Sequence, residues 1–558
     1  MLEQLDQVDW KHLTHAYGSA QDIPKLLRLL MDPSEKVGEE ALFELSGSLN
    51  HQGSVYEATA HVVPFLVELA SNPSVPDRHN ILSLVSGAAA SWTAALRDAP
   101  DNPAAPPLMF RVTAERVASE RPHREAAHRA VEQEFPALER LLHDSVPTVR
   151  VAAAFVIADL FEHRESAPCL LRRIESEHDD WCRAGAILAL ESLAHGSSPD
   201  HVTPVANRCF LEVFRDADAG PDSRLSAGLA LLLRGEKKHL EETLALARSR
   251  LASDLKPFLS LPSIRHSSNL FSLVTESLRA WPESRVAWIL EGLASPDPNI
   301  VSAAVSRTGH LCREVRWGPS RMAPALRKLV DSPDLENRSQ AIYGLAELGI
   351  AGAEVLWELA DHPLEDVRAE AALRLARIRT RETERMIRFD EPSTDELPSV
   401  PSLIATIERH EGQRRWDDVE EVCRAVRSLS LYGPSATEGI EVVRRQVEHA
   451  MTTISLNPLA ASQLRITAIR TLWRITQDAD EVVPLAIQAV EPDRHGILAI
   501  EQLREIGPPA SAALPVLRRI VETEQRFTPN GDHCGCCPDD EAFETAARVA
   551  IDAIAASS

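Results

Sequence analysis

A short phrase recurs along the chain: a proline followed by apolar residues at helical spacing. It reads IPKLLRLL at the first copy and LPVLRRIV at the last, and the copies contain Pro24, Pro64, Pro136, Pro168, Pro324, Pro484 and Pro515. Proline is accommodated in the first turn of an α-helix, where its missing N–H would have no intrahelical partner. The apolar positions that follow form a stripe along one helix face. The phrase therefore predicts a series of helices that each open at the proline and bury one face.

A second phrase follows the first and predicts that the helices are paired. In FPALERLLHDSVPTVRVAAAFVIADL we expect the first helix to end at Asp144 and the second to open at Val149 and Arg150. The same pattern recurs at Arg338 and Arg368, which are 30 residues apart. Two helices with short turns fit this period, whereas a βαβ unit would require strand-like runs that the sequence lacks.

This pattern resembles the HEAT repeat, in the variant common in bacterial HEAT-repeat proteins. In that family an Asp lies in the turn within the repeat, and a Val-Arg-x-x-Ala phrase opens the second helix. The resemblance implies an all-α fold, a right-handed α-solenoid (superhelix) of HEAT-like helical hairpins. We expect the recurrent arginines to pair with the turn Asp of a neighbouring repeat, which is a structural network rather than a ligand site.

The repeat pattern is interrupted, and the interruptions predict the domain organisation. Five prolines between Pro100 and Pro122 would break a helix, so we expect a long loop there. The predicted order is N-terminal HEAT-like repeats at 1–96, a Pro-rich insertion or loop at 97–122, a central HEAT-like array at 123–388, an acidic Pro-containing linker at 389–401 that permits a hinge, and C-terminal HEAT-like repeats at 402–558 with a Cys-rich loop at 526–540.

One interruption, NHQGSVYEAT, gathers polar side chains in a region otherwise rich in Leu and Ala. It resembles a His-Gln-Gly-x-x-Tyr segment near the N-terminus of some bacterial HEAT-repeat proteins, a resemblance that supplies no role. Its candidate binding residues are His51, Gln52, Tyr56 and Glu57. The alternative is a structural turn, capped by Asn50 and packed by Tyr56.

The Cys-rich segment RFTPNGDHCGCCPDDEAF gathers His533, Cys534, Cys536 and Cys537 within five residues. Thiolates and imidazole are the ligands that zinc prefers, so these four are the candidate metal ligands. Ligands this close in sequence do not easily surround one tetrahedral ion, because usual sites draw two pairs from separate segments. A loop with incidental cysteines and no cofactor is therefore the favoured interpretation, with zinc as the alternative.

The sequences PDRHNIL and PDRHGIL, at 76–82 and 492–498, are nearly identical. In each, the Asp is placed to cap a helix whose first turn holds Arg and His, and the Ile and Leu are expected to enter the core. We interpret the two copies as repeat ancestry rather than as two functional sites.

Acidic residues outnumber basic ones by 83 to 59, giving a formal net charge of -24. Phosphate backbones attract basic surfaces, so nucleic acid is a poor partner for such a chain, and a basic protein is the better one. No apolar run approaches the roughly 20 residues that span a bilayer, and no basic and apolar leader is present. We therefore expect a cytoplasmic protein with no membrane segment.

No phosphate-binding loop, nucleophile elbow or H-E-x-x-H motif is present, so no catalytic residues are predicted. The predicted function is a non-catalytic scaffold or adaptor that holds a protein partner on its concave face, in an inhibitor, immunity or assembly role. The alternative, by family resemblance, is a HEAT-like DNA-binding protein or DNA glycosylase, or a chromophore lyase. The net acidity weighs against the DNA-binding classes.

Overall fold

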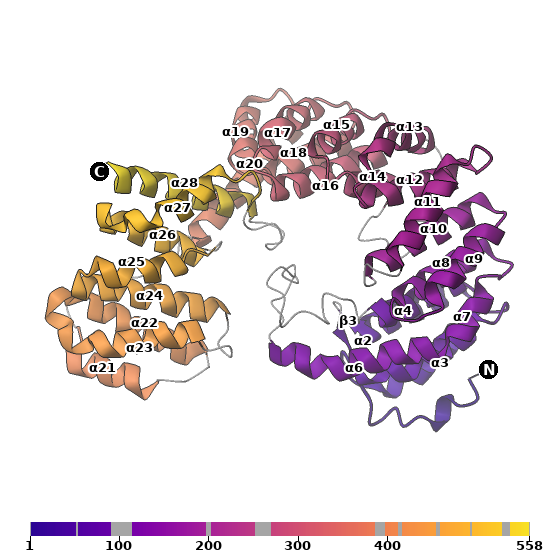
Figure 1. The fold of residues 1–558 in the computed structure, drawn as a ribbon, viewed down its shortest axis with the longest axis horizontal. Coiled ribbons are helices and arrows are strands. Elements are labelled where there is room, and N and C mark those ends of the chain that lie inside the picture. Colours follow the sequence, from indigo (N-terminus) through magenta and orange to yellow (C-terminus); the bar gives the residue numbers. More distant parts are fainter. Residues whose placement is uncertain are drawn as a thin grey trace. The chain divides into compact units, whose positions relative to one another are not determined.

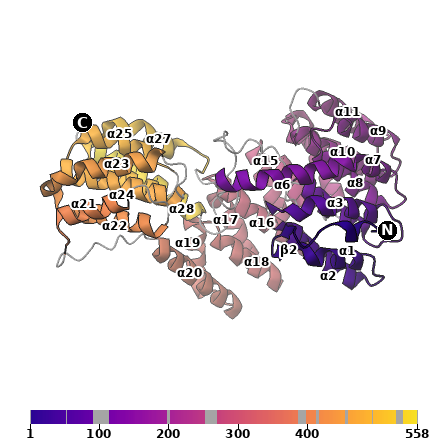
Figure 2. The same cartoon turned by 90° about the horizontal axis from the view of Figure 1, so that it is seen from below.

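This computed structural model describes residues 2–51, 54–90, 114–196, 202–251, 269–385, 397–410, 416–452, 458–491, 494–526 and 536–556. They form two compact units that divide between Gly292 and Leu293. Each unit is built of successive packed α-helices, and its loops connect neighbouring helices (Figures 1 and 2). Named strands in the described residues are limited to two short antiparallel hairpins. The predicted all-α solenoid is confirmed.

The first unit begins with the hairpin elements and continues as paired helices. Its elements are η1 (Leu5–Gln7), β1 (Thr14–His15), β2 (Gly18–Ser19), η2 (Ala20–Asp22), α1 (Ile23–Leu29), α2 (Glu35–Leu49), β3 (Asn50–His51), β4 (Ser54–Val55), α3 (Glu57–Ala70), α4 (Arg78–Ala90), α6 (Ala114–Gln133), α7 (Phe135–Leu141), α8 (Pro147–Asp159), α9 (Ser166–Ser176), α10 (Asp180–Gly196), α11 (Thr203–Arg215), α12 (Pro221–Leu233), η3 (Lys237–His239), α13 (Leu240–Leu251), α14 (Leu270–Ser277) and α15 (Pro282–Leu293).

In its described residues, the second unit consists of helices and their connections, with one isolated bridge described below. Its elements are α16 (Pro298–Glu314), α17 (Gly318–Leu329), α18 (Leu335–Ala346), α19 (Ile350–Glu358), η5 (Leu359–Asp361), α20 (Glu365–Arg385), α21 (Val400–Arg409), α22 (Trp416–Leu431), η7 (Gly433–Gly439), α23 (Ile440–Thr452), α24 (Pro458–Thr476), α25 (Ala479–Gln488), α26 (Arg494–Ile506), η8 (Pro508–Ala513), α27 (Leu514–Glu522) and α28 (Cys536–Ala555). Over both units, no described helix is long and apolar enough to cross a membrane.

The recurrent proline marks a first helix of a pair, but it does not always open that helix. Pro24, Pro136 and Pro515 lie in the first two positions of α1, α7 and α27, as predicted. The prediction is wrong at Pro64, Pro324 and Pro484, which lie inside α3, α17 and α25.

All three helices begin one to two turns before the proline, and in α25 and α3 the backbone is capped upstream. The Asp478 side chain accepts hydrogen bonds from the N–H groups of Asp480 and Glu481. At α3, Tyr56 and Thr59 form a capping box. An upstream cap extends the helix past the proline, which costs the one backbone hydrogen bond that proline cannot donate.

The predicted loop at 97–122 is wrong for its last part. Residues 114–122 belong to α6, which contains Pro122, while residues 97–113 lie outside the described residues. Helix α6 lies beside α3 and also contacts α4 (Figures 1 and 2). Within α6, Arg124 is buried and donates a 2.6 Å hydrogen bond to Glu120 across one turn. Tertiary packing and this ion pair offset the cost of an interior proline.

The recurrent arginines form the predicted network between repeats. Arg338 Nη2 lies 2.7 Å from Oδ2 of Asp366, the second residue of α20 in the next repeat. Arg78 donates to both carboxylate oxygens of Asp144, at 2.7 and 3.0 Å. Arg150 uses a glutamate instead, with Nε 3.0 Å from Glu177 Oε2.

The same guanidinium groups also close their own hairpins. Arg338 Nη1 donates to the carbonyls of Ser332 and Pro333, at 2.9 and 3.0 Å. Arg368 does the same to His362 and Pro363. These carbonyls lie in the turn between the two helices, so the guanidinium supplies donors to backbone groups outside both helices. The arginines are thus explained by the fold, and Arg78, in the PDRHNIL sequence, is one of them.

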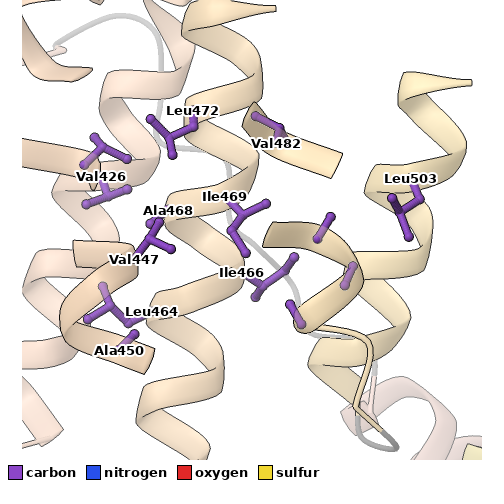
Figure 3. Close-up of a cluster of buried hydrophobic side chains, with 14 of the residues drawn as sticks. Val426, Val447, Ala450, Leu464, Ile466, Ala468, Ile469, Leu472, Val482 and Leu503 are labelled. Carbon is purple, nitrogen blue, oxygen red and sulfur yellow. The ribbon is translucent and has the colours of Figure 1, made fainter. Parts of the chain in front are cut away.

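The C-terminal helices bury a continuous apolar core (Figure 3). Leu464, Ala468 and Leu472 line α24, which packs against α22, α23, α25 and α26. Val426 and Val447 approach α24 from α22 and α23. Because every one of these helices contributes to the same core, the segment from α21 to α28 is one array.

The last part of this array is fastened to the loop between α16 and α17. Arg316 N–H donates to the Glu524 carbonyl and Arg526 N–H to the Glu314 carbonyl, both at 2.9 Å, on either side of an antiparallel bridge between Val315 and Gln525. Arg316 and Arg526 both pair with Asp540 at the start of α28, at 2.9 and 3.0 Å. We call these three charged residues the clasp.

Candidate functional site

The predicted binding segment forms a small hairpin that leads into α3. His51 pairs with Ser54 in the β3–β4 register, and Asn50 pairs with Val55. Glu57 is the exposed first residue of α3, and Gln52 lies outside the described residues. Ser54 Oγ donates a 3.0 Å hydrogen bond to Glu120 of α6, so the hairpin also supports that helix.

Tyr56 is placed by structural contacts, in agreement with the alternative that the segment is a turn. It is the N-cap residue of α3, and its N–H donates to Thr59 Oγ1 at 3.1 Å. The Thr59 hydroxyl in turn donates to the Leu49 carbonyl at 2.9 Å, at the end of α2. These bonds fix the angle between α2 and α3 through the Tyr56 backbone, and binding by the Tyr56 side chain stays a prediction.

His51 is different, because it contacts an exposed aromatic side chain. Its Nδ1 lies 3.2 Å from the Tyr17 hydroxyl, and the two rings are nearly perpendicular with centroids 5.4 Å apart. Tyr17 lies in the turn between β1 and β2. Its N–H donates to Nδ1 of His15 at 3.0 Å, and the His15 Nε2 lies 3.0 Å from Asp22 Oδ1. The tyrosine is therefore held at its backbone and at its hydroxyl.

A second exposed aromatic side chain lies on the helix next to Tyr17. A Cβ placed on Gly47 of α2 would lie 3.6 Å from the Tyr17 hydroxyl, so the tyrosine lies over Gly47. Phe43 precedes Gly47 by four residues and therefore occupies the same helix face one turn away. Phe43 is 81% exposed and Tyr17 69%, the two highest values for large hydrophobic side chains in the described residues. We call Phe43, Tyr17 and His51 the aromatic strip.

The charge around the aromatic strip is acidic. Glu39, Glu40 and Glu44 of α2 are exposed and lie within four residues of Phe43. Helical side chains lean toward the N-terminus of their helix, which directs Phe43 toward the turn that carries Glu39 and Glu40. Glu40 lies 3.9 Å from Lys36, whereas within the described part of the chain neither Glu39 nor Glu44 has an ion-pair partner.

The sequence analysis did not identify Phe43 or Tyr17. Phe43 carried a usable signal, because Ala41, Leu45 and Leu49 define the buried face of α2 and Phe43 falls off it. A large apolar residue outside the apolar stripe of a helix indicates an exposed patch. Tyr17 carried no such signal, since its position depends on a two-residue strand pair.

The candidate metal ligands are only partly placed. Cys536 and Cys537 begin α28, whereas His533 and Cys534 lie outside the described residues. Across the described ranges, no three His, Cys, Asp or Glu side chains are grouped so that they could hold a metal ion. The five cysteines elsewhere in the chain are free thiols. The metal site therefore stays a prediction.

The repeat seen in the structure also matches a known family. The family model described as HEAT repeat matches residues 135–164, which contain α7, α8 and the turn that carries Asp144. Residues 135–164 are therefore similar to a HEAT repeat. Other HEAT-like pairs in the chain share the arginine network described above. The comparison with curated proteins gives no match.

The comparison with solved structures gives matches of low identity and low TM-score. A crystal structure of importin beta in an ammonium sulfate condition is 11% identical with a TM-score of 0.34, and the match covers 96% of this chain and 77% of importin beta. A structure that describes Kap95p binding, which induces the switch loops of RanGDP to adopt the GTP-bound conformation, has the same identity and TM-score. That match covers 96% of this chain and 67% of the other. No inference about function rests on similarities of this size.

Proposed function

We propose that this protein is a non-catalytic scaffold or adaptor that binds a basic protein partner in the cytoplasm. The observation that supports the proposal is the aromatic strip, in which Phe43 and Tyr17 are held exposed to solvent. Aromatic side chains supply most of the binding energy at many protein interfaces, and exposing them without a partner is unfavourable. The net charge of -24 favours a basic partner.

The alternative of a DNA-binding protein gains no support from this surface. Glu39, Glu40 and Glu44 would repel a phosphate backbone where the aromatic side chains are exposed. The recurrent arginines of the repeats already bind carboxylates and carbonyls of the fold, as Arg78 and Arg338 do. Their charge is therefore largely neutralised by the fold.

Affinity purification of the full chain from its native host, with mass spectrometry and nucleic-acid detection, tests the proposal. We expect a protein partner of basic isoelectric point that is released at high salt, because exposed charge pairs are screened by salt. Nuclease treatment serves as the control, since it leaves a protein complex intact. Recovery of DNA without any protein partner would overturn the scaffold function.

A further inference from the structure

The geometry of α2 points to a specific class of ligand: we infer that the aromatic strip binds a linear protein segment in which arginines alternate with apolar side chains. This inference rests on the proposed scaffold function and adds the chemistry of the bound segment. It depends on three features of one surface, namely the exposed rings, the carboxylates beside them and the fixed position of Tyr17.

The rings and the carboxylates are suited to arginine together. A guanidinium stacks on an aromatic face and at the same time donates two hydrogen bonds to a carboxylate. Phe43 and Tyr17 provide the faces, one helical turn apart along α2. Glu39 and Glu44 provide carboxylates that have no ion-pair partner among the described residues, so a ligand would not have to displace one.

Tyr17 is also held in a fixed position without a ligand. Hydrogen bonds at 3.0 Å to His15 and at 3.2 Å to His51 hold the backbone and the hydroxyl of Tyr17. Ordering a side chain in advance lowers the entropy that is lost on binding. Because Gly47 has no side chain, Tyr17 lies close to α2 one turn from Phe43, and an apolar residue of the ligand would pack against the exposed Phe43 ring.

Other occupants fit this surface less well. A nucleic acid would bring its phosphates against Glu39, Glu40 and Glu44. An anionic membrane surface would be repelled by the same three carboxylates. A basic protein segment is the occupant whose charge complements the surface.

The test uses the full-length protein and two synthetic fluorescent peptides of equal length. One peptide alternates arginine with leucine and phenylalanine, and the other has glutamate at each arginine position. Fluorescence anisotropy should show that the arginine peptide binds at least about tenfold more tightly than the glutamate peptide. Phe43→Ser should weaken binding of the arginine peptide about tenfold, as expected for a central aromatic contact. The double variant Glu39→Gln/Glu44→Gln should weaken it several-fold and reduce its dependence on salt.

Two matched controls lie in the second unit. Leu335→Ser removes another exposed apolar side chain, and Glu336→Gln/Glu365→Gln removes two exposed carboxylates. Both should leave peptide binding within about twofold of wild type, since only the aromatic strip is proposed to bind. Equal binding of the two peptides, or an unchanged affinity in Phe43→Ser, would overturn the inference.

The same variant separates this inference from the proposed function. A native protein partner that is captured equally by wild type and Phe43→Ser would overturn the role of the aromatic strip while the scaffold function stands. Loss of that partner in Phe43→Ser, with retention in Leu335→Ser, supports both. Capture of DNA alone would overturn both.

Discussion

Arg526 and Asp540 form a buried ion pair, with Nη1 3.0 Å from Oδ2, at the two ends of the Cys-rich segment. The side chains of both residues are almost completely buried. Arg526 Nε also donates to the Cys312 carbonyl at 2.7 Å. The pair therefore brings together the start and end of one segment and fastens both to the end of α16.

Removing the charge of Asp540 should destabilise the second unit strongly. Asp540→Asn leaves the buried Arg316 and Arg526 with only the more distant carboxylates of Glu544 and Glu541, each at 3.5 Å, and removing the closest partner of a buried charge costs about 3 kcal/mol or more. Urea denaturation should show this loss in the free energy of unfolding. Hydrogen exchange should accelerate in α28 before it does in α18.

The matched control for this clasp variant is Asp552→Asn. Asp552 lies about three turns further along α28 and is exposed to solvent. Its substitution should cost less than about 1 kcal/mol, because surface changes away from buried pairs have small effects on stability. If the two variants were equally stable, the clasp would not fasten the array.

The arginine network between repeats predicts unequal effects for two of the carboxylates that it contains. Burial acts to raise the pKa of Asp144, but hydrogen bonds from Arg78 and the Val146 N–H outweigh it and hold that pKa below its ordinary value. Asp144→Ala leaves the buried Arg78 without its carboxylate and should cost about 2–3 kcal/mol. Asp366→Ala should cost much less, because the Asp366 side chain is exposed to solvent. Thermal unfolding of the two variants compares them directly, and a larger loss for Asp366→Ala would contradict this reasoning.

The lowered pKa of Asp144 makes the stability of the arginine network depend on pH. The stability that Asp144 contributes is present above the ordinary carboxyl pKa and is lost as the pH falls through its lower pKa in the folded protein. Stability curves of wild type and Asp144→Asn should therefore converge in acid. A constant difference between them down to pH 2 would show that the charge of Asp144 is not what stabilises the fold.

Asp159 should give the opposite pH dependence. Burial raises its pKa to about 7, against the influence of a 2.5 Å hydrogen bond from Ser86. Because the protonated form is favoured in the folded state, its contribution to stability is lost as the pH rises through about 7. The free energy of unfolding should fall by about 1 kcal/mol between pH 6 and pH 8.

The variant Asp159→Asn isolates this contribution from other titrating groups. Burial lowers the pKa of His79 and His239 in the same unit, so each measurement is compared with the variant at the same pH. The fall between pH 6 and pH 8 should be smaller in Asp159→Asn. An identical fall in both proteins would assign the effect to other residues.

The Cys-rich segment should not carry a metal ion. Elemental analysis of protein purified without oxygen is expected to find substoichiometric zinc, because His533, Cys534, Cys536 and Cys537 are too close in sequence to surround one ion easily. A value near one zinc per chain, lost in Cys536→Ser/Cys537→Ser, would establish the metal site instead.

Local patterns predicted most of the fold because each repeat depends on nearby residues. The spacing around Arg150 and Arg338 predicted helix pairs and their connections, which the structure confirms. Prolines were less reliable, since Pro122 and Pro484 lie within helices that upstream caps or tertiary packing stabilise. Whether a proline opens a helix or lies inside it depends on these caps and tertiary contacts, which the proline itself does not indicate.

The candidate site was predicted only in part, and the clasp was not predicted. His51 was identified from its polar neighbourhood, but Tyr17 reaches it from 34 residues away. Arg316 and Asp540 are separated by 224 residues and share no sequence motif. No repeat period connects such positions, so only the folded chain reveals that they meet.

The recurrent arginines have a further consequence for how the number of repeats in this chain can change. The guanidinium groups of Arg78, Arg150 and Arg338 bind carbonyls of their own hairpin and a carboxylate of the next one. The contact between neighbouring repeats is therefore directional, and each repeat carries its own residues for it. A duplicated hairpin brings these residues with it and a deleted one removes them. Whole repeats can thus be gained or lost without compensating substitutions, much as monomers are added to a polymer.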